Sequence, residues 1–139
     1  MKAEIAEGEE LTPLALRPDL EQVIKFCGLT WAFPRFFYDI DAARAQGMPG
    51  TLVPGPLKLG LLCRAVEDWL DGRGWVCHVR AAHRRPDITG RPITITGRVV
   101  RTFEHQGRER ADLELAVVNE DGAVSVRGFA TVELQAAAS

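Results

Sequence analysis

The sequence has little that would mark it as a membrane, secreted or metal-binding protein. No stretch approaches the ~20 apolar residues of a transmembrane helix, and the longest apolar segment, residues 57–62, is interrupted by Lys58. The N-terminus is acidic and lacks the basic and apolar regions of a signal peptide. The three cysteines, Cys27, Cys63 and Cys77, form neither a metal knuckle nor a C-x-x-C motif. We therefore expect a cytoplasmic protein with free thiols, no metal and no membrane contact.

An excess of basic charge is also missing. The chain has 17 Lys and Arg against 19 Asp and Glu, for a net charge of −2. A nucleic-acid-binding protein usually shows a strong basic excess, so we expect no nucleic-acid partner. Repeats, low-complexity tracts and linkers are absent too, and 139 residues suit one domain. The sequence therefore predicts a single domain over residues 1–139.

Helical spacing and turn residues fill the first half of the chain. Asp19 precedes a helical pattern, and with Gln22 three residues later it forms a loose capping box. Gly28 is a candidate end for this helix. Asp39 is a candidate N-cap of a second, short helix, and Gly47 stands where a C-terminal cap belongs.

A third, longer helix is predicted over residues 56–70. Pro56 suits its first position, where the missing N–H costs nothing. The segment is so apolar that only Lys58, Arg64, Glu67 and Asp68 are left to face water. We therefore expect protein to surround this helix on most sides.

The second half of the chain alternates apolar and polar residues, as strands do. The predicted strands cover residues 75–79, 92–102, 111–118 and 124–132, and turn residues join the later ones at 105–107 and 119–122. One buried helix followed by an antiparallel meander predicts an α+β fold in which a curved sheet wraps the helix.

The segment from Phe26 to Val100 resembles the MaoC-like dehydratases, or (R)-specific enoyl-CoA hydratases, which have the hotdog fold. The motifs that carry the resemblance are Tyr38-Asp39 with the Ala-rich helix after it, Gly47-Met48-Pro49-Gly50, Pro54-Gly55-Pro56-Leu57, the stretch Arg84-Arg85-Pro86 to Gly90-Arg91-Pro92, and Gly97-Arg98-Val99-Val100. Residues 29–39 and 49–57 are most similar to the mesaconyl-CoA hydratase branch. The resemblance implies a hotdog domain with its central helix at about residues 56–70.

The resemblance also implies a chemistry. Members of this family add water across the 2,3 double bond of an enoyl thioester, and need no cofactor besides the coenzyme A thioester itself. An Asp or Asn and a His, five residues apart, hold and deprotonate the water. Backbone N–H groups at the start of the central helix stabilise the charge that develops on the thioester oxygen.

The sequence departs from the family at the reacting groups. The family's His falls on Phe37 and its Asp or Asn falls on Ala32, and neither residue transfers protons. The His often found before the helix falls on Pro54, and a Ser or Thr of some members falls on Cys63. The Gly55-Pro56 start of the helix is kept. The binding half of the site is therefore expected to remain, while the chemical half is lost.

Few residues are candidates to replace the missing pair. Tyr38, Asp39 and Cys63 are weak substitutes, with Arg35 beside them, but a helix N-cap explains Asp39 and packing explains Tyr38. His78 and His83 lie five apart on a predicted strand, which places them on opposite faces unless a bulge intervenes. His105 lies in a turn, where we expect it to be solvated.

Three groups of residues are candidates for substrate binding. The first is the helix start, Gly55, Pro56 and Leu57. The second is the aromatic set, which lines either an acyl pocket or a core or dimer interface: Trp31, Phe33, Phe36 and Phe37. The third is a basic set, which meets either the phosphates of coenzyme A or solvent: Arg80, Arg84, Arg85 and Arg91.

Three functions fit these observations. We prefer a non-catalytic (vestigial) acyl-CoA-binding subunit of a heteromeric (R)-specific enoyl-CoA hydratase, whose partner is a catalytically competent MaoC-like subunit. In family pairs of this kind, the vestigial half widens the acyl pocket for a bulky substrate. One alternative is a self-sufficient hydratase, dehydratase or polyketide- or lipid-pathway enzyme with rewired residues. The other is an acyl-CoA-binding homodimer without catalysis. The ligand in each case is an acyl-CoA or acyl-carrier-protein thioester.

Overall fold

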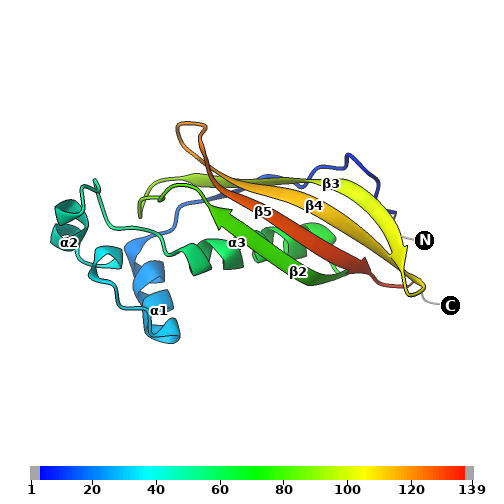
Figure 1. Ribbon diagram of the computed structural model, residues 1–139, viewed down its shortest axis with the longest axis horizontal. Helices are drawn as coiled ribbons and strands as arrows, with labels where there is room; N and C mark the ends of the chain where they lie inside the picture. Colours follow the sequence, from blue (N-terminus) through cyan, green and yellow to red (C-terminus); the bar gives the residue numbers. More distant parts are fainter. Residues whose placement is uncertain (1–3, 137–139) are drawn as a thin grey trace.

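One long helix packs on a curved antiparallel sheet in the computed structural model, which describes residues 4–136 (Figure 1). The predicted domain limits, residues 1 and 139, lie outside this range. The expected α+β architecture is confirmed. The elements, in chain order, are β1 (Leu14–Leu16), α1 (Leu20–Thr30), the short 3-10 helix η1 (Arg35–Phe37), α2 (Ile40–Ala45), α3 (Gly55–Leu70), β2 (Gly74–His83), β3 (Ile93–His105), β4 (Arg108–Asn119) and β5 (Val124–Leu134).

The strand order of the sheet is β1-β3-β4-β5-β2. The meander of β3, β4 and β5 is as predicted. The position of β2 is not, because β2 pairs with β5 rather than with β3. The connection from β2 to β3 crosses the entry to α3, where Val53 N–H donates to the Asp87 carbonyl and Thr89 N–H donates to the Thr51 carbonyl. This crossing leaves β2 at one edge of the sheet.

The other edge carries β1, which the sequence did not predict because three residues are too few to show an alternation. Its Leu14 pairs with Ile95 of β3. Residues before β1 extend the cover along β3, since Gly8 N–H donates to the Val99 carbonyl and Leu11 N–H donates to the Gly97 carbonyl. This edge is therefore covered.

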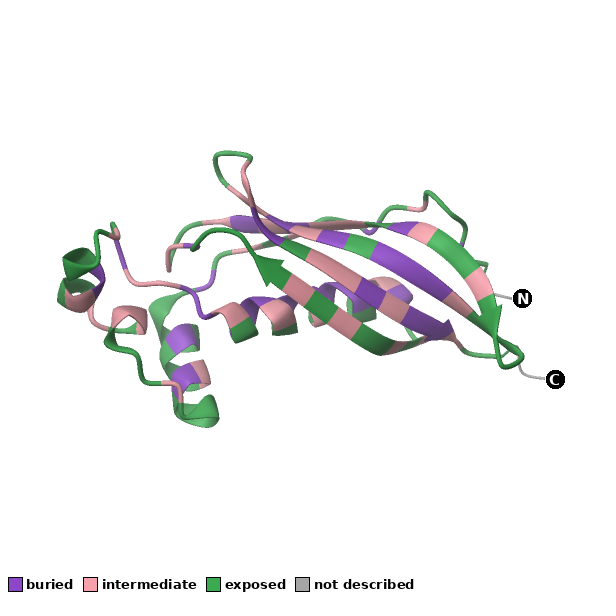
Figure 2. Ribbon diagram, viewed as in Figure 1, coloured by how far each residue is buried: buried purple, intermediate pink, exposed green. Residues whose placement is uncertain are grey.

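The core lies between α3 and the inward face of the sheet, where buried and exposed residues alternate along the strands (Figure 2). Buried side chains of α3 meet buried side chains of the strands, among them Leu61, Leu62, Val66, Leu70, Val99, Leu113, Val117, Val126 and Val132. The helix begins at Gly55, one residue before the predicted start, with Pro56 in its first turn. Lys58 was expected to face water, and this was wrong, because its side chain is buried in an ion pair with Asp87.

The segment containing α1, η1 and α2, here called the overhang (residues 19–47), projects beyond the end of the sheet (Figure 1). Asp19 caps α1 as predicted, and its Oδ1 accepts from Gln22 N–H at 2.8 Å. Gly28 does not end α1. The helix continues to Thr30 and ends at Trp31, which adopts a left-handed conformation with φ 57°. Asp39 caps α2, and Gly47 follows that helix with φ 79°, so both of these predictions are confirmed.

Candidate functional site

Three segments meet at the start of α3. The entry segment, residues 51–54, contacts the overhang because Leu52 N–H donates to the Phe36 carbonyl at 3.1 Å. The same entry segment pairs with the β2–β3 connection, where Leu52 and Ile88 form an isolated bridge. The entry segment that leads into α3 is therefore fixed from two sides by backbone hydrogen bonds.

A buried ion pair holds the β2–β3 connection against the helix. Lys58 Nζ lies 3.0 Å from Asp87 Oδ2, and the two side chains are only 3% and 4% exposed. The same ammonium lies 3.4 Å from the Arg85 carbonyl, to which it donates. Removing one member of a buried pair leaves an uncompensated charge. The sequence does not predict this ion pair, because a lone Lys on an apolar helix normally faces water.

No side chain caps the start of α3. Its N-cap residue is Pro54, and Pro56 has no N–H to donate. The first N–H groups of any helix lack acceptors within that helix, which here leaves those of Gly55 and Leu57. The helix dipole adds a partial positive charge at the same end. The start of α3, at the predicted binding residues Gly55 to Leu57, therefore suits an oxygen that carries negative charge.

The imidazole of His83 lies against this helix start. A Cβ placed on Gly55 would come 3.1 Å from His83 Nε2 and 3.2 Å from its Cε1, so the absence of a side chain at Gly55 permits the approach. Desolvation lowers the pKa of His83, the nearby Lys58 ammonium lowers it further, and Asp87 opposes this. The side chain is therefore a neutral imidazole near pH 7.

The two strand histidines face opposite sides of the sheet, as their spacing predicted. His83 pairs with Val126, whose side chain is in the core, whereas His78 pairs with Thr131 on the outer face. The bulge in β2 lies between Val76 and His78, so it does not separate His78 from His83. His105 is exposed at the end of β3, as expected.

The two positions on which the resemblance places the family's acid–base pair hold no polar side chain. Ala32 is half-buried, and its N–H donates to the Cys27 carbonyl at the end of α1. Phe37 is half-buried against the core, and its ring centroid lies 4.6 Å from that of Phe36. No other residue of the segment from Trp31 to Phe37 is an acid or a histidine.

The weak substitutes are engaged elsewhere. The Tyr38 hydroxyl donates to the Phe33 carbonyl at 3.1 Å. Asp39 accepts from the N–H groups of Asp41 and Ala42, and forms an ion pair with Arg35. The hydrogen bond from Arg35 is the main cause that lowers the pKa of Asp39. This carboxylate is therefore a helix cap and not a free base.

Cys63 is half-buried on α3. Burial raises the pKa of its thiol, and the neighbouring Glu67 raises it further. Only the thiolate is a good nucleophile. Cys63 therefore stays protonated near pH 7 and is a poor candidate for covalent chemistry.

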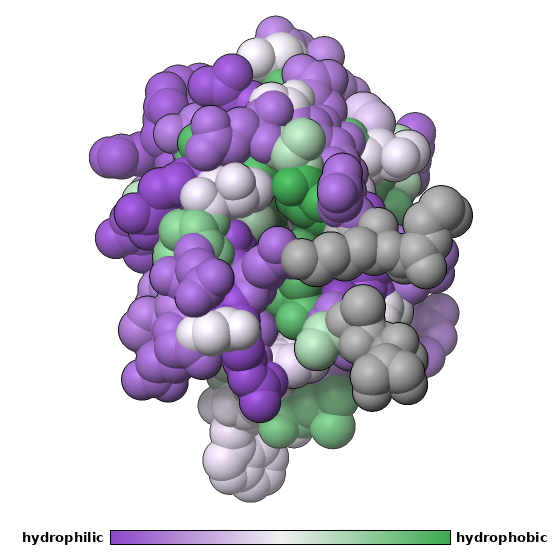
Figure 3. Space-filling view, turned by 90° about the vertical axis from the view of Figure 1, so that its right-hand side faces the viewer, coloured by the Kyte–Doolittle hydropathy of each residue, from purple (hydrophilic) through white to green (hydrophobic). Residues whose placement is uncertain are grey.

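The aromatic set divides into two parts. Phe37 packs against the core with the half-buried Phe36 beside it, whereas Trp31 and Phe33 stack edge-to-face with centroids 5.2 Å apart on the exposed side. Further apolar side chains of the overhang are exposed, namely Leu20, Ile24, Leu29, Tyr38 and Ile40. The end of the molecule that Figure 3 shows differs, since it is largely hydrophilic, with smaller apolar patches between the polar side chains.

The basic set is divided as well. Arg84 and Arg85 directly follow His83, and their backbone N–H groups donate to the Ser125 carbonyl. Both are exposed, and within residues 4–136 no carboxylate pairs with either side chain. Arg91 lies 3.9 Å from Glu120 in an exposed ion pair. Arg80 belongs to the outer face, where its guanidinium lies 4.7 Å from the ring centroid of Phe129.

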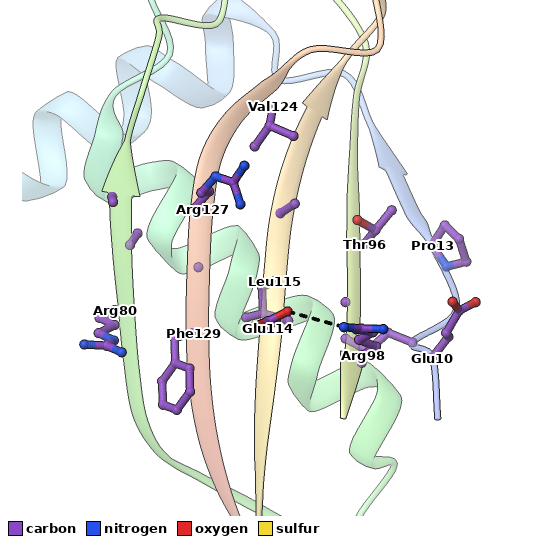
Figure 4. Close-up of a pocket in the computed structure, with 16 residues that line it drawn as sticks. Glu10, Pro13, Arg80, Thr96, Arg98, Glu114, Leu115, Val124, Arg127 and Phe129 are labelled. Carbon is purple, nitrogen blue, oxygen red and sulfur yellow. Dashed lines mark ion pairs between the residues drawn. The ribbon is translucent and has the colours of Figure 1, made fainter. Parts of the chain in front are cut away.

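That outer face also bears a cavity of about 690 Å³ (Figure 4). Figure 4 shows it in front of the strands with α3 behind them. Its wall includes the Arg98–Glu114 ion pair, 3.9 Å long. Apart from Arg80, no residue predicted for the site lines this cavity.

No group of three or more His, Cys, Asp or Glu residues within 4–136 is arranged to hold a metal ion. None of the helices in that range is long and apolar enough to cross a membrane.

Solved structures share this architecture, although no protein-family model matches the chain and no curated protein matches it in sequence. The (R)-hydratase from A. caviae, involved in PHA biosynthesis, is 21% identical with a TM-score of 0.85, over 96% of this chain and 99% of that one. A MaoC-like dehydratase from Rhodospirillum rubrum is 17% identical with a TM-score of 0.83, over 97% and 96%. The chain has the hotdog fold. The expected structural likeness to MaoC-like dehydratases and (R)-hydratases is thereby confirmed.

A two-component hotdog structure is similar as well. The ChsH1-ChsH2 complex from Mycobacterium tuberculosis matches with 20% identity and a TM-score of 0.84, over 95% of this chain and all of the matched one. At such identities the likeness concerns the fold alone. The loss of the Asp and His at Ala32 and Phe37 therefore stays a prediction.

Proposed function

We propose that this hotdog chain is a thioester-binding subunit of an enoyl-thioester hydratase, and that a catalytically competent hotdog partner supplies the usual Asp and His. The observation that carries the proposal is an uncapped start of α3 beside an overhang segment, residues 31–37, that holds no acid or histidine. A site of this kind binds and polarises a thioester. It lacks the pair that moves protons in the enzymes it resembles.

The N–H groups of Gly55 and Leu57 are the donors for the thioester oxygen in this proposal. Arg84 and Arg85 emerge beside the same end of α3, because the Arg85 carbonyl accepts from Lys58. Guanidinium groups match phosphate geometry, so these two residues suit the phosphates of coenzyme A or of a carrier-protein prosthetic group. Arg91 is a weaker candidate, because Glu120 already pairs with it.

The free edge of β2 is the proposed contact for the partner. Within residues 4–136 no strand pairs with its outer side, whereas β1 and the residues before it cover the opposite edge of the sheet. An unpaired ten-residue strand is a template for another strand. Trp75 on this strand is 42% exposed, and the overhang adds the exposed apolar side chains described above. The ChsH1-ChsH2 complex supports assembly from two different hotdog chains.

A bulky acyl group suits this proposal. Leu29 and Trp31 are 87% and 82% exposed on the overhang, and large apolar side chains seldom stay in water when a partner or ligand is available to cover them. Phe37 at the usual His position also replaces a polar group with an apolar one. Both features add apolar surface to the overhang, which contacts the entry segment of α3 through Leu52 and Phe36.

The test is an enoyl-CoA hydration assay on the purified chain, alone and with a hotdog protein that carries the Asp and His pair and is encoded beside it. Short, long and steroid-type enoyl thioesters are compared. A missing acid–base pair costs about 10²–10⁴-fold in rate, so the mixture should exceed the lone chain by a factor of that order. Rates from the lone chain equal to those of the mixture would refute the partner requirement.

A further inference from the structure

We propose that His83 gives this chain a proton-transferring group of its own, placed at the start of α3 instead of in the overhang. The inference rests on the proposed thioester site and goes beyond it. It predicts a slow hydration activity of the isolated chain, and it assigns that activity to one imidazole at the end of β2.

The first argument is position. Among the three histidines, His83 alone points to the helix side of the sheet and meets the start of α3. Its Nε2 edge is the part that would touch a Cβ at Gly55. Gly55 is also the first residue of α3, so the imidazole lies beside the N–H groups proposed to hold the thioester oxygen.

The second argument is availability. No hydrogen bond or ion pair within residues 4–136 engages the His83 ring, unlike Tyr38 and Asp39, whose polar atoms already have partners. The side chain is exposed at the helix start, so a water molecule has access to it. A ring nitrogen with a free lone pair is what a general base requires.

The third argument is charge. The charged groups that face His83 are Lys58 from α3 and Asp87 from the β2–β3 connection, and Arg84 and Arg85 follow it in the chain. Desolvation and Lys58 lower its pKa against the smaller opposite effect of Asp87. A neutral imidazole at pH 7 can accept a proton from water, and the imidazolium that forms can return it.

The proposed reaction needs only water and the enoyl thioester. His83 takes a proton from water while the water oxygen bonds to C3. The electron pair of the C2=C3 bond moves toward the thioester carbonyl, whose oxygen gains negative charge beside the Gly55 and Leu57 N–H groups. The imidazolium then gives the proton to C2, and the product is the 3-hydroxyacyl thioester.

The experiment uses crotonyl-CoA for hydration and butyryl-CoA, which cannot be hydrated, for binding. His83→Gln keeps the size and hydrogen-bonding capacity of the side chain but transfers no proton. His78→Gln is the matched control, because it lies on the same strand and faces outward beside Thr131. We expect H83Q to lower kcat of the lone chain by about 10²-fold or more, with unchanged butyryl-CoA affinity, and H78Q to change neither.

A pH profile separates proton transfer from a structural role. For the lone wild-type chain, kcat should fall as the pH drops through the pKa of His83, which lies below the ordinary value of 6.5, and H83Q should lack this limb. Butyryl-CoA binding without any hydration above buffer, or H83Q with an unchanged kcat and profile, overturns the role of His83 and leaves the thioester site standing. Absence of butyryl-CoA binding by the wild-type chain overturns both proposals.

Discussion

Breaking the Lys58–Asp87 pair should destabilise the protein far more than breaking any surface pair. Replacing Lys58 by Met keeps the length and apolar stem of the side chain but leaves the Asp87 carboxylate unpaired where it is 4% exposed. Removing one partner of a buried pair costs about 3–5 kcal/mol. The lost hydrogen bond to the Arg85 carbonyl adds little, because its 3.4 Å length makes it weak.

Urea denaturation of wild type and Lys58→Met measures this cost directly, and a thermal scan should show Tm lower by roughly 10–20 °C for a chain of this size. Lys25→Met is the control. Its ion pair with Glu21 spans one helical turn and is exposed, with side chains 70% and 74% accessible, so its loss should cost less than about 0.5 kcal/mol. A Lys58→Met cost below about 1 kcal/mol would refute the reasoning, because it would place Asp87 in contact with water.

Three further predictions use other parts of the fold. A Cβ at Gly97 would lie 2.5 Å from Leu115 Cδ2 and 3.0 Å from the Glu114 carbonyl, so Gly97→Ala should cost about 1–3 kcal/mol, whereas Gly60→Ala, with open space around its helical position, should stabilise by about 0.5–1 kcal/mol. Equal effects in denaturant titrations would contradict both. Asp39 has a lowered pKa, so its stabilising effect should be complete above the ordinary value of 3.8 and be lost as the pH falls through the lowered value, and Asp39→Ala should remove this part of the stability–pH curve. Leu29→Ser and Trp31→Asn should leave the Tm of the isolated chain unchanged but weaken assembly with a partner, measured by light scattering; unchanged assembly would exclude the overhang as a contact.

Local features of the fold were predictable from the sequence, and the reasons are local as well. Asp19 and Asp39 cap helices through hydrogen bonds to residues two or three positions away, which spacing alone reveals. The long apolar pattern of α3 and the alternation of β3, β4 and β5 likewise report burial on one face. The local sequence of each of these elements is therefore enough to predict it.

Features that depend on contacts between distant segments were not predictable in the same way. The position of β2 beside β5 follows from the path of the β2–β3 connection, and no local pattern states which edge a strand joins. The burial of Lys58 depends on Asp87, which lies beyond the following strand. A helix pattern shows which residues are apolar, but not that a lysine among them has a buried carboxylate opposite.

The candidate site shows the same division. The residues of the overhang could be compared with the family motif in sequence order, and residues 31–37 hold no acid or histidine beside Ala32 and Phe37. The position of His83 at the start of α3 was not predicted, because its neighbour Gly55 belongs to a different element and is distant in sequence. The sequence did hold one usable signal, since odd spacing from His78 already put one of the two histidines on the helix side of the sheet.

The buried pair and His83 belong to one arrangement of charge. A buried ion pair is often no more stabilising than two apolar side chains of the same volume, so stability alone does not explain a lysine at position 58. Its ammonium also lowers the pKa of His83, while Asp87 raises it. An apolar pair, Lys58→Met with Asp87→Leu, should therefore retain most of the stability that the single variant loses. Because Lys58 acts on His83 more strongly than Asp87 does, the same double variant should raise the pKa of His83 and move the acid limb of the hydration profile to higher pH, which NMR titration of the His83 ring would show.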